Sequence, residues 1–267
     1  MSDGRQKPLG PAHSSDSLAD TLPDIARRVR ARTPARLLVG RAGAAYRTET
    51  QLDLRDAHAA ARDAVRAELE IRDAFDPAFV QLFRLFAVRT RARSKDEYLL
   101  RPDLGRLLGD ESDAEIKKCC PLGQDLQIVI GDGLSVPAVI AQVPALLPLL
   151  HVGAAERGWS VGRTFVVRHC RVGLLNEVGQ LLNPKVTLLL IGERPGLATA
   201  ESLSAYMAYQ PRASHTDANR NLISNIHSRG LSASQAANRI LNLAAHMMQN
   251  RISGYTLREN PGNTLAK

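Results

Sequence analysis

The hydrophobic positions of the N-terminal part of the chain recur at helical spacing. Within 51–75 the apolar side chains return about every third or fourth residue, and acids and arginines alternate between them as on an exposed helix. The pair Asp76-Pro77 interrupts this pattern, and a second helix is expected over 77–88. The stretch 89–108 is polar and contains a proline and a glycine, which predicts a linker or a docking loop.

The pattern changes near residue 112, where short apolar runs begin to alternate with helical segments. Strands are expected at 125–131, 163–172 and 185–192, and helices at 136–150, 177–182 and 232–248. The run Lys185–Gly192 is apolar on both faces, as a central strand of a covered parallel sheet is. Ser232 and Gln235 have the spacing of a capping box at the start of the last helix. Alternating strands and helices predict an open α/β sheet.

Three regions follow from these patterns. Residues 1–24 are rich in Ser, Asp, Gly and Pro, and they are expected to form a disordered tail. Residues 25–110 are expected to form an N-terminal helical region, and residues 111–267 the α/β domain. Within that domain, 219–227 combines hydrogen-bonding side chains with two apolar pairs, which fits either an ordinary edge strand or a strand that lines a ligand site.

Charge divides the chain into two unequal halves. The 267 residues carry a formal net charge of +8, and Arg supplies 29 of the 35 basic side chains. Residues 1–133 have a balance of +1, and residues 134–267 have a balance of +7. The second half is therefore expected to face something anionic, such as a phosphate-bearing cofactor or an acidic protein. Nucleic acid is not expected as a partner, because the chain has no zinc-finger spacing, basic zipper or ribonucleoprotein motif.

The cysteines and the apolar runs predict where the protein resides. Cys119, Cys120 and Cys170 fit neither a disulfide framework nor a metal-ligand pattern, which indicates a reducing compartment. The first 30 residues contain no apolar stretch of signal-peptide length. The longest apolar run, 136–150, is too short to span a bilayer. A cytoplasmic protein with no membrane partner is expected.

Two loops that follow predicted strands are candidates for ligand binding. Gly131–Ser135 has the position of a loop whose backbone amides approach a phosphate, but Val136 stands where the dinucleotide fingerprint needs its third glycine. A tight strand-to-helix turn capped by Ser135 fits the same residues equally well. Glu193 lies just past the apolar strand, where ligands bind in open α/β sheets. The alternative for Glu193 is a salt bridge to an arginine such as Arg194.

The sequence contains no convincing set of residues for acid–base or nucleophilic catalysis. The histidines are scattered, no His or Cys pair has zinc spacing, and no Walker loop is present. The chain is therefore expected to be either a binding subunit or an enzyme whose reactive group belongs to a cofactor.

Six segments in this order resemble the small (light) subunit of ethanolamine ammonia-lyase, and the resemblance runs from about residue 30 to 258. The segments are Thr33–Gly43, His58–Val65, Tyr98–Arg106, Gly131–Ser135, Gly192–Leu197 and Ile223–His227. The resemblance implies a Rossmann-like, mostly parallel sheet and an adenosylcobalamin-dependent radical enzyme that converts ethanolamine into acetaldehyde and ammonia. It also implies a TIM-barrel large subunit that holds the substrate, a hetero-oligomer, and residence inside a bacterial microcompartment in many members.

The resemblance carries three cobalamin-contact positions over to this chain. Val172 follows His169-Cys170-Arg171, and Glu193 lies in Gly-Glu-Arg-Pro-Gly. Leu222 stands where the family commonly has Cys, so a contact made by packing can persist there but a contact through sulfur cannot. No catalytic residue and no metal ligand is implied on this chain, because the radical and substrate groups of the family belong to the large subunit.

Two other functions stay open at this point. One is a stand-alone α/β enzyme that binds a nucleotide at Gly131–Ser135, although the chain offers neither the third glycine nor a ribose-binding acid after the next strand. The other is an interaction protein that has kept the fold and lost the cofactor, for which Leu222 is the only indication.

Overall fold

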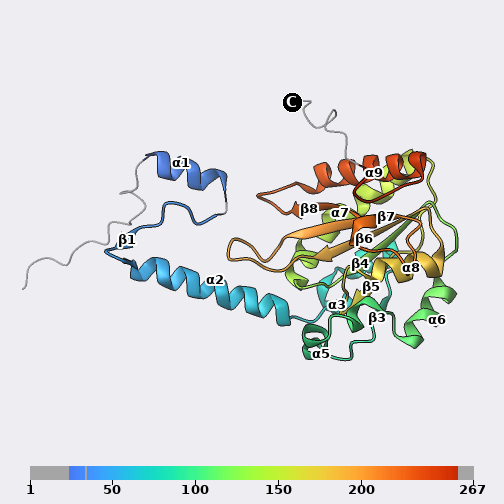
Figure 1. Ribbon diagram of the computed structural model, residues 1–267, viewed down its shortest axis with the longest axis horizontal. Coiled ribbons are helices and arrows are strands. Elements are labelled where there is room, and N and C mark those ends of the chain that lie inside the picture. Colours follow the sequence, from blue (N-terminus) through green and yellow to red (C-terminus); the bar gives the residue numbers. More distant parts are fainter. Residues whose placement is uncertain (1–23, 34, 258–267) are drawn as a thin grey trace, which may run out of the picture.

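The computed structural model describes residues 24–33 and 35–257, and its centre is one six-stranded mixed sheet (Figure 1). The strand order is β3-β5-β4-β6-β7-β8. The strands are β3 (Ala87–Arg89), β4 (Leu126–Gly131), β5 (Phe165–Arg168), β6 (Val186–Gly192), β7 (Leu203–Tyr209) and β8 (Asn221–Ile226). The first four strands in this order are parallel to one another. Strand β7 pairs antiparallel with β6, and β8 pairs antiparallel with β7. The predicted α/β class with a mostly parallel sheet is confirmed.

The helices surround this sheet and also form an extension on its N-terminal side. They are α1 (Asp24–Arg32), α2 (Thr48–Arg66), α3 (Ile71–Ala74), α4 (Pro77–Phe83), α5 (Lys95–Leu100), α6 (Asp110–Cys119), α7 (Val136–Glu156), α8 (Leu174–Leu182) and α9 (Ala233–Asn250), with 3-10 turns η2 (Leu104–Arg106) and η3 (Asp217–Asn219). A small hairpin, β1 (Arg41–Ala42) with β2 (Ala45–Tyr46), precedes α2. Most of the predicted tail, residues 1–23, lies outside the described residues.

Two apolar cores lie on opposite faces of the sheet. Side chains alternate along β4, so Ile128 and Ile130 belong to the core shared with α7 and α9, while Val129 belongs to the core shared with α6 and α8. The same alternation holds on β6, where Leu188 and Leu189 face opposite cores. Because both faces are covered, all seven residues of β6 are buried, as the apolar run 185–192 predicts.

The apolar helix α7 is longer than the predicted 136–150 and continues to Glu156. By length and composition alone it could cross a membrane, with a mean hydropathy of 1.7. Its buried residues, however, pack on the sheet and against α9, as those of a core helix do. Close packing explains Gly153, where a Cβ would lie 2.3 Å from a methyl carbon of Leu241 on α9.

The N-terminal part departs from prediction in three places. The expected helix 51–75 is interrupted, because α2 ends at Arg66 and Leu69 turns into the core with no exposed surface. The expected helix 77–88 ends at Phe83, and β3 follows it as an edge strand paired with β5. The stretch 89–108 is not a free linker, because it folds into α5 and η2 and buries Tyr98 completely.

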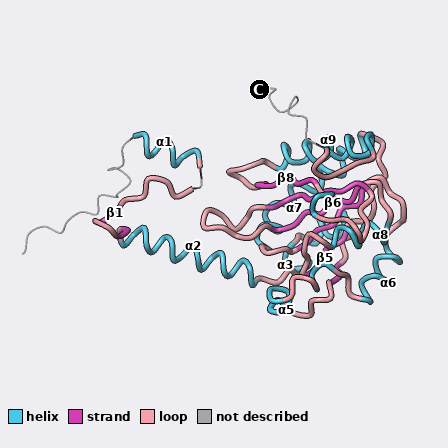
Figure 2. The backbone as a smooth tube through the Cα atoms, in the orientation of Figure 1, coloured by secondary structure: helices cyan, strands magenta, loops and turns pink. Residues whose placement is uncertain are grey.

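The helix α2 projects from the body as an arm that also carries the hairpin and α1 (Figures 1 and 2). Of its 19 residues only Ala64 is buried. His58 lies exposed on this helix. The domain boundaries predicted at residues 24/25 and 110/111 stay predictions, although β3 joins residues 87–89 to the main sheet.

Candidate functional site

The loops after β4, β5 and β6 meet at one edge of the sheet, because parallel strands end on the same side. A cavity of about 460 Å³ lies there and is bordered by all three loops. Its lining includes Val172, Glu193 and Leu222 together. Three residues that are 21 to 50 positions apart in the sequence are therefore neighbours around one opening.

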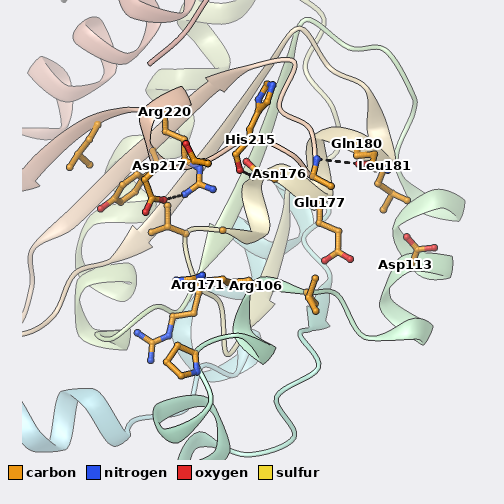
Figure 3. A pocket seen from close by; sticks show the side chains of 18 of the residues that line it. Arg106, Asp113, Arg171, Asn176, Glu177, Gln180, Leu181, His215, Asp217 and Arg220 are labelled. Carbon is orange, nitrogen blue, oxygen red and sulfur yellow. Dashed lines mark hydrogen bonds and ion pairs between the residues drawn. The ribbon is translucent and has the colours of Figure 1, made fainter. Parts of the chain in front are cut away.

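A second, larger cavity of about 1280 Å³ adjoins the first (Figure 3). The two cavities share Arg171, Val172, Tyr206 and Leu222 as lining residues. The larger cavity leads from the carboxyl edge along α8 to the loop between β7 and β8, and Val172 and Leu222 lie at its boundary with the smaller cavity. We call the two cavities together the groove.

Glu193 joins the ends of three strands at this edge. Its carboxylate accepts hydrogen bonds from the Ser202 hydroxyl at 3.0 Å, from the Ser204 hydroxyl and from the backbone amide of Asn225 at 3.2 Å. The alternative expectation for Glu193, a salt bridge to an arginine, is wrong among the described residues. A carboxylate has about four acceptor sites, so Glu193 can also accept a hydrogen bond from a ligand at the cavity wall.

Val172 and Leu222 give the groove an apolar wall. Val172 is half-buried, and Leu222 lies on β8 opposite Tyr206 of β7 with 46% of its surface exposed. An apolar side chain this open on an edge strand offers packing to a ligand rather than to the core. The segment 219–227 contains the edge strand β8, and Leu222 from it borders the groove. That the strand lines a ligand site stays a prediction.

Asp132 organises the edge from beneath, and its role was missed by sequence reasoning. This fully buried carboxylate accepts from the backbone amides of His169 at 2.9 Å and Cys170 at 2.8 Å. The ammonium of Lys95 lies 3.5 Å from the same carboxylate. Asp132 thereby holds the turn after β5, in which His169 has a φ of 58°, and so places Val172 at the cavity. The available signal was an acid between two glycines at a strand end.

The Gly131–Ser135 loop is a tight strand-to-helix turn. Ser135 caps α7 by accepting from the Ala138 amide at 3.4 Å. Two backbone amides of the loop are already used inside the protein. The amide of Asp132 donates to the Val167 carbonyl at 3.3 Å, and the amide of Leu134 donates to the Gly192 carbonyl at 3.1 Å. These contacts favour the turn over a phosphate-cradling loop.

We expect the substitution Gly133→Ala to destabilise the chain. Gly133 has a φ of +59°, and a Cβ there would lie 2.2 Å from the backbone oxygen of Gly192. Strain and overpacking together predict a loss of about 1–3 kcal/mol in the free energy of unfolding, measured by urea denaturation. Gly43→Ala is the control for φ alone, because its φ is +61° with nothing within 4 Å. Equal losses of unfolding free energy in the two variants would contradict the close approach of Gly133, in the loop after β4, to Gly192 at the end of β6.

The wall nearest α5 is formed by Arg171 and by Tyr98, which belongs to the stretch expected to be a linker or a docking loop. The Tyr98 hydroxyl donates to the Cys170 carbonyl at 3.1 Å, and the Arg171 guanidinium lies 4.2 Å from the centre of the Tyr98 ring. Arg171 also donates to the Tyr98 carbonyl at 3.1 Å. The apolar run Tyr98-Leu99-Leu100 was the available signal that this stretch packs, although only Tyr98 is fully buried and Leu100 is 81% exposed.

His169 connects the edge to the end of the arm. Its Nε2 lies 3.0 Å from a carboxylate oxygen of Glu68, two residues past the end of α2, and its Nδ1 lies 3.0 Å from the Ala92 carbonyl oxygen. The ligand atoms of Glu68, Asp132 and His169 lie within 4.8 Å of one another, a distance that would suit a metal ion. Within this group, Asp132 already accepts from two backbone amides and lies beside Lys95.

Stability should depend on the charge of Glu68. Burial alone would raise the pKa of Glu68, but the His169 hydrogen bond and the charges of His169, Lys95 and Arg168 together hold it below the ordinary value of 4.5. A lowered folded pKa adds stability that is present above the ordinary value and is lost as the pH falls through the folded pKa. We therefore expect the difference in urea midpoint between the wild type and Glu68→Gln to be largest at neutral pH and to shrink below pH 4.5.

The neighbouring Glu70→Gln variant controls for this pH dependence. Glu70 pairs with Arg168 at 2.6 Å but is more exposed than Glu68, so we expect a smaller midpoint difference. A Glu68→Gln difference that stays constant from neutral pH to pH 3 would show that the ionised form of Glu68 adds nothing.

Comparison with known proteins gives a consistent family. The family model described as "Ethanolamine ammonia-lyase light chain (EutC)" matches residues 23–258. The ethanolamine ammonia-lyase small subunit of Clostridioides difficile (strain 630) is 42% identical over 230 residues, which are 86% of this chain and 76% of that protein. The small subunit of Rhodopseudomonas palustris (strain BisA53) is 42% identical over 234 residues, 88% of this chain and 90% of that protein. The small subunit of Xanthomonas campestris pv. campestris (strain B100) is 39% identical over 247 residues, 89% of each.

Proposed function

The chain belongs to the ethanolamine ammonia-lyase light-chain family, and we propose that it closes one side of an adenosylcobalamin site against the large subunit of that enzyme. As the small subunit of a lyase it is part of a two-chain enzyme. The proposal concerns what its groove holds. We also propose that the four parallel strands of the sheet, β3-β5-β4-β6, with helices on both faces, form a Rossmann-like fold.

One observation carries the proposal. The three positions that the family resemblance selects, Val172, Glu193 and Leu222, line one cavity at the carboxyl edge of the sheet. That edge is where open α/β sheets bind ligands. The resemblance selects these positions by their motifs alone, so their meeting at one opening supports a shared ligand.

The groove offers the kinds of contact that a cobalamin needs. The corrin ring presents apolar faces and a fringe of carboxamides, and its nucleotide tail carries a phosphodiester. Val172 and Leu222 offer apolar packing, and the Glu193 carboxylate can accept a carboxamide N–H. Arginines line the larger part of the groove. When bound, adenosylcobalamin supplies the radical chemistry, and the residues of this chain hold and orient it.

The described residues give the smaller cavity no acid–base set of its own. No histidine lines it, and the cavity-lining thiol of Cys170 is fully buried, which raises its pKa well above the ordinary value. A protonated, enclosed thiol is a poor nucleophile. This arrangement fits a subunit that binds a cofactor more closely than it fits a self-sufficient enzyme.

The projecting arm supports the proposed large-subunit partner. Its exposed apolar side chains include Ile25, Leu38, Tyr46 and Leu52, each with 45% or more of its surface accessible. Apolar groups on an arm that stands away from the body are typical of a surface that another chain covers.

An activity assay tests the proposal. The chain is co-expressed with the large subunit, and acetaldehyde formation from ethanolamine and adenosylcobalamin is measured with and without it. The proposal expects activity only when both chains are present. Turnover by the large subunit alone, or by this chain alone, would contradict the assigned role.

A further inference from the structure

The larger part of the groove contains an unusual concentration of unpartnered polar atoms. Among the described residues, six buried side-chain nitrogen or oxygen atoms lack a hydrogen-bond partner. Four of them belong to residues that line this cavity, namely Arg171 Nε, Asn176 Oδ1, His215 Nδ1 and Arg220 Nε. Buried polar atoms in folded proteins nearly always have partners, so their concentration at one cavity indicates a polar ligand.

Arg220 is the most enclosed charge of this group. Only 7% of its side chain is exposed, and its one carboxylate partner, Asp217, is 92% exposed. That single contact uses one terminal nitrogen and leaves Nε free. Burial lowers the pKa of Arg220, the Asp217 charge opposes this shift, and the nearby charge of Arg106 adds to it. A buried guanidinium with so little compensation favours a second anion.

Arg106 and Arg171 line the same cavity, and Arg106 is close enough for its charge to lower the pKa of Arg220. Arg171 is fixed by the Tyr98 ring and the Tyr98 carbonyl, with its Nε unpartnered. The side chain of Arg106 passes over Gly173, where a Cβ would lie 2.8 Å from Arg106 Cγ. Within the described chain Arg106 makes no side-chain hydrogen bond or ion pair. We call Arg106, Arg171 and Arg220 the arginine cluster.

The acids of the cavity do not neutralise this cluster. Asp113 pairs with Lys117 at 2.7 Å, and Glu177 accepts from the backbone amide of Leu108. Both acids lie on the opposite side of the cavity from Arg220 in the close view (Figure 3). Of the lining carboxylates, only Asp217 contacts the cluster, and it is open to solvent.

We propose that the arginine cluster binds a phosphoryl group of a ligand in the larger cavity. Guanidinium forks match the oxygens of phosphate in pairs, and several arginines around one cavity suit a tetrahedral group with several oxygens better than a single carboxylate. The phosphoryl group has two sources, the phosphodiester of the nucleotide tail of a cobalamin or free phosphate. The first source rests on the proposed function, and the second does not.

Titration of the full chain with inorganic phosphate tests the cluster without the large subunit. Calorimetry is expected to detect binding that Arg106→Gln and Arg220→Gln each weaken by about tenfold or more. Arg106→Gln is the safer variant for folding, because its side chain is exposed and unpartnered. Arg157→Gln is the matched control, since Arg157 bonds to Gly153 and Asn242 outside the cavity, and phosphate affinity should not change.

Equilibrium dialysis of the two-chain complex separates the two sources. The probes are cyanocobalamin and cobinamide, a corrin that lacks the nucleotide and its phosphodiester. If the cluster holds the cofactor's phosphodiester, Arg106→Gln weakens cyanocobalamin by about tenfold and leaves cobinamide unchanged. If it holds free phosphate, the variant loses phosphate binding and both corrinoids bind as in the wild type.

The proposal is overturned if the variants match the wild type toward inorganic phosphate and toward both corrinoids. It is also overturned if Arg106→Gln weakens both corrinoids equally, because the effect would then not depend on the phosphodiester. A wild-type complex that binds neither corrinoid would refute the proposed function, and the phosphate titration would still decide whether the cluster is an anion site.

Discussion

Replacing Asp132 by Asn should destabilise the chain by about 3–5 kcal/mol, the loss seen when one partner of a buried charged pair is removed. The carboxylate accepts hydrogen bonds from the backbone amides of His169 and Cys170, in the turn after β5. It also lies 3.5 Å from the buried ammonium of Lys95. An amide in its place would turn an NH₂ group toward one of those donors and leave Lys95 without its buried carboxylate partner. The measurement is urea denaturation followed by circular dichroism.

Asp96→Asn is the control for the loss of a carboxylate as such. Asp96 pairs with Arg66 at 3.0 Å, but both side chains are more than 60% exposed, so the expected loss is about 0–1 kcal/mol. A loss at Asp132 no larger than the loss at Asp96 would show that the edge of the sheet does not depend on this carboxylate.

The second large effect is expected at Glu193, on cofactor affinity. Glu193→Ala removes a charged acceptor at the cavity wall and releases three donors, on Ser202, Ser204 and Asn225. One hydrogen bond from a ligand to a charged group is worth about 1.5–3 kcal/mol. Loss of the Glu193 acceptor should therefore lower the affinity of the two-chain complex for cyanocobalamin about 10- to 100-fold. Equilibrium dialysis measures it.

Leu222→Met is the matched control at the same cavity. This swap keeps side-chain volume on the half-exposed face of β8 and should cost less than about 1.5 kcal/mol, below the expected effect of Glu193→Ala. Glu193→Gln then separates charge from shape. Affinity that is unchanged in both Glu193 variants would favour an interaction protein that has kept the fold and lost the cofactor.

The elements that sequence reasoning located are those whose signal is local. The run 185–192 is apolar at nearly every position and corresponds to β6, and the Ser232–Gln235 capping box marks the observed start of α9. Both depend on contacts within a few residues of the chain. The edge strand β8 lies within the polar and apolar mixture of 219–227 for the same reason.

The elements that were missed depend on contacts between distant segments. Strand β3 has three residues, too few to show an alternating pattern, and it forms because β5 pairs with it. The predicted helix 51–75 breaks after Arg66 although Ala67–Glu70 contains ordinary helix formers. Burial of Leu69 and the pairing of Glu68 with His169 override that propensity.

The candidate site shows the same division. Its position after β4, β5 and β6 follows from the strand pattern, and family resemblance supplied Val172, Glu193 and Leu222. Asp132 could not be assigned a partner from sequence, because its donors lie 37 and 38 residues away. The arginine cluster was equally hidden, since 29 arginines are spread over the chain and only the fold selects three of them.

The most direct test of the account is a structure of the two-chain complex with bound cyanocobalamin. The account predicts the corrin ring between the two chains, in contact with Val172, Glu193 and Leu222, with the arm residues Ile25, Leu38 and Leu52 covered by the large subunit. A corrin bound entirely within the large subunit, with the carboxyl edge of this sheet facing solvent, would contradict it.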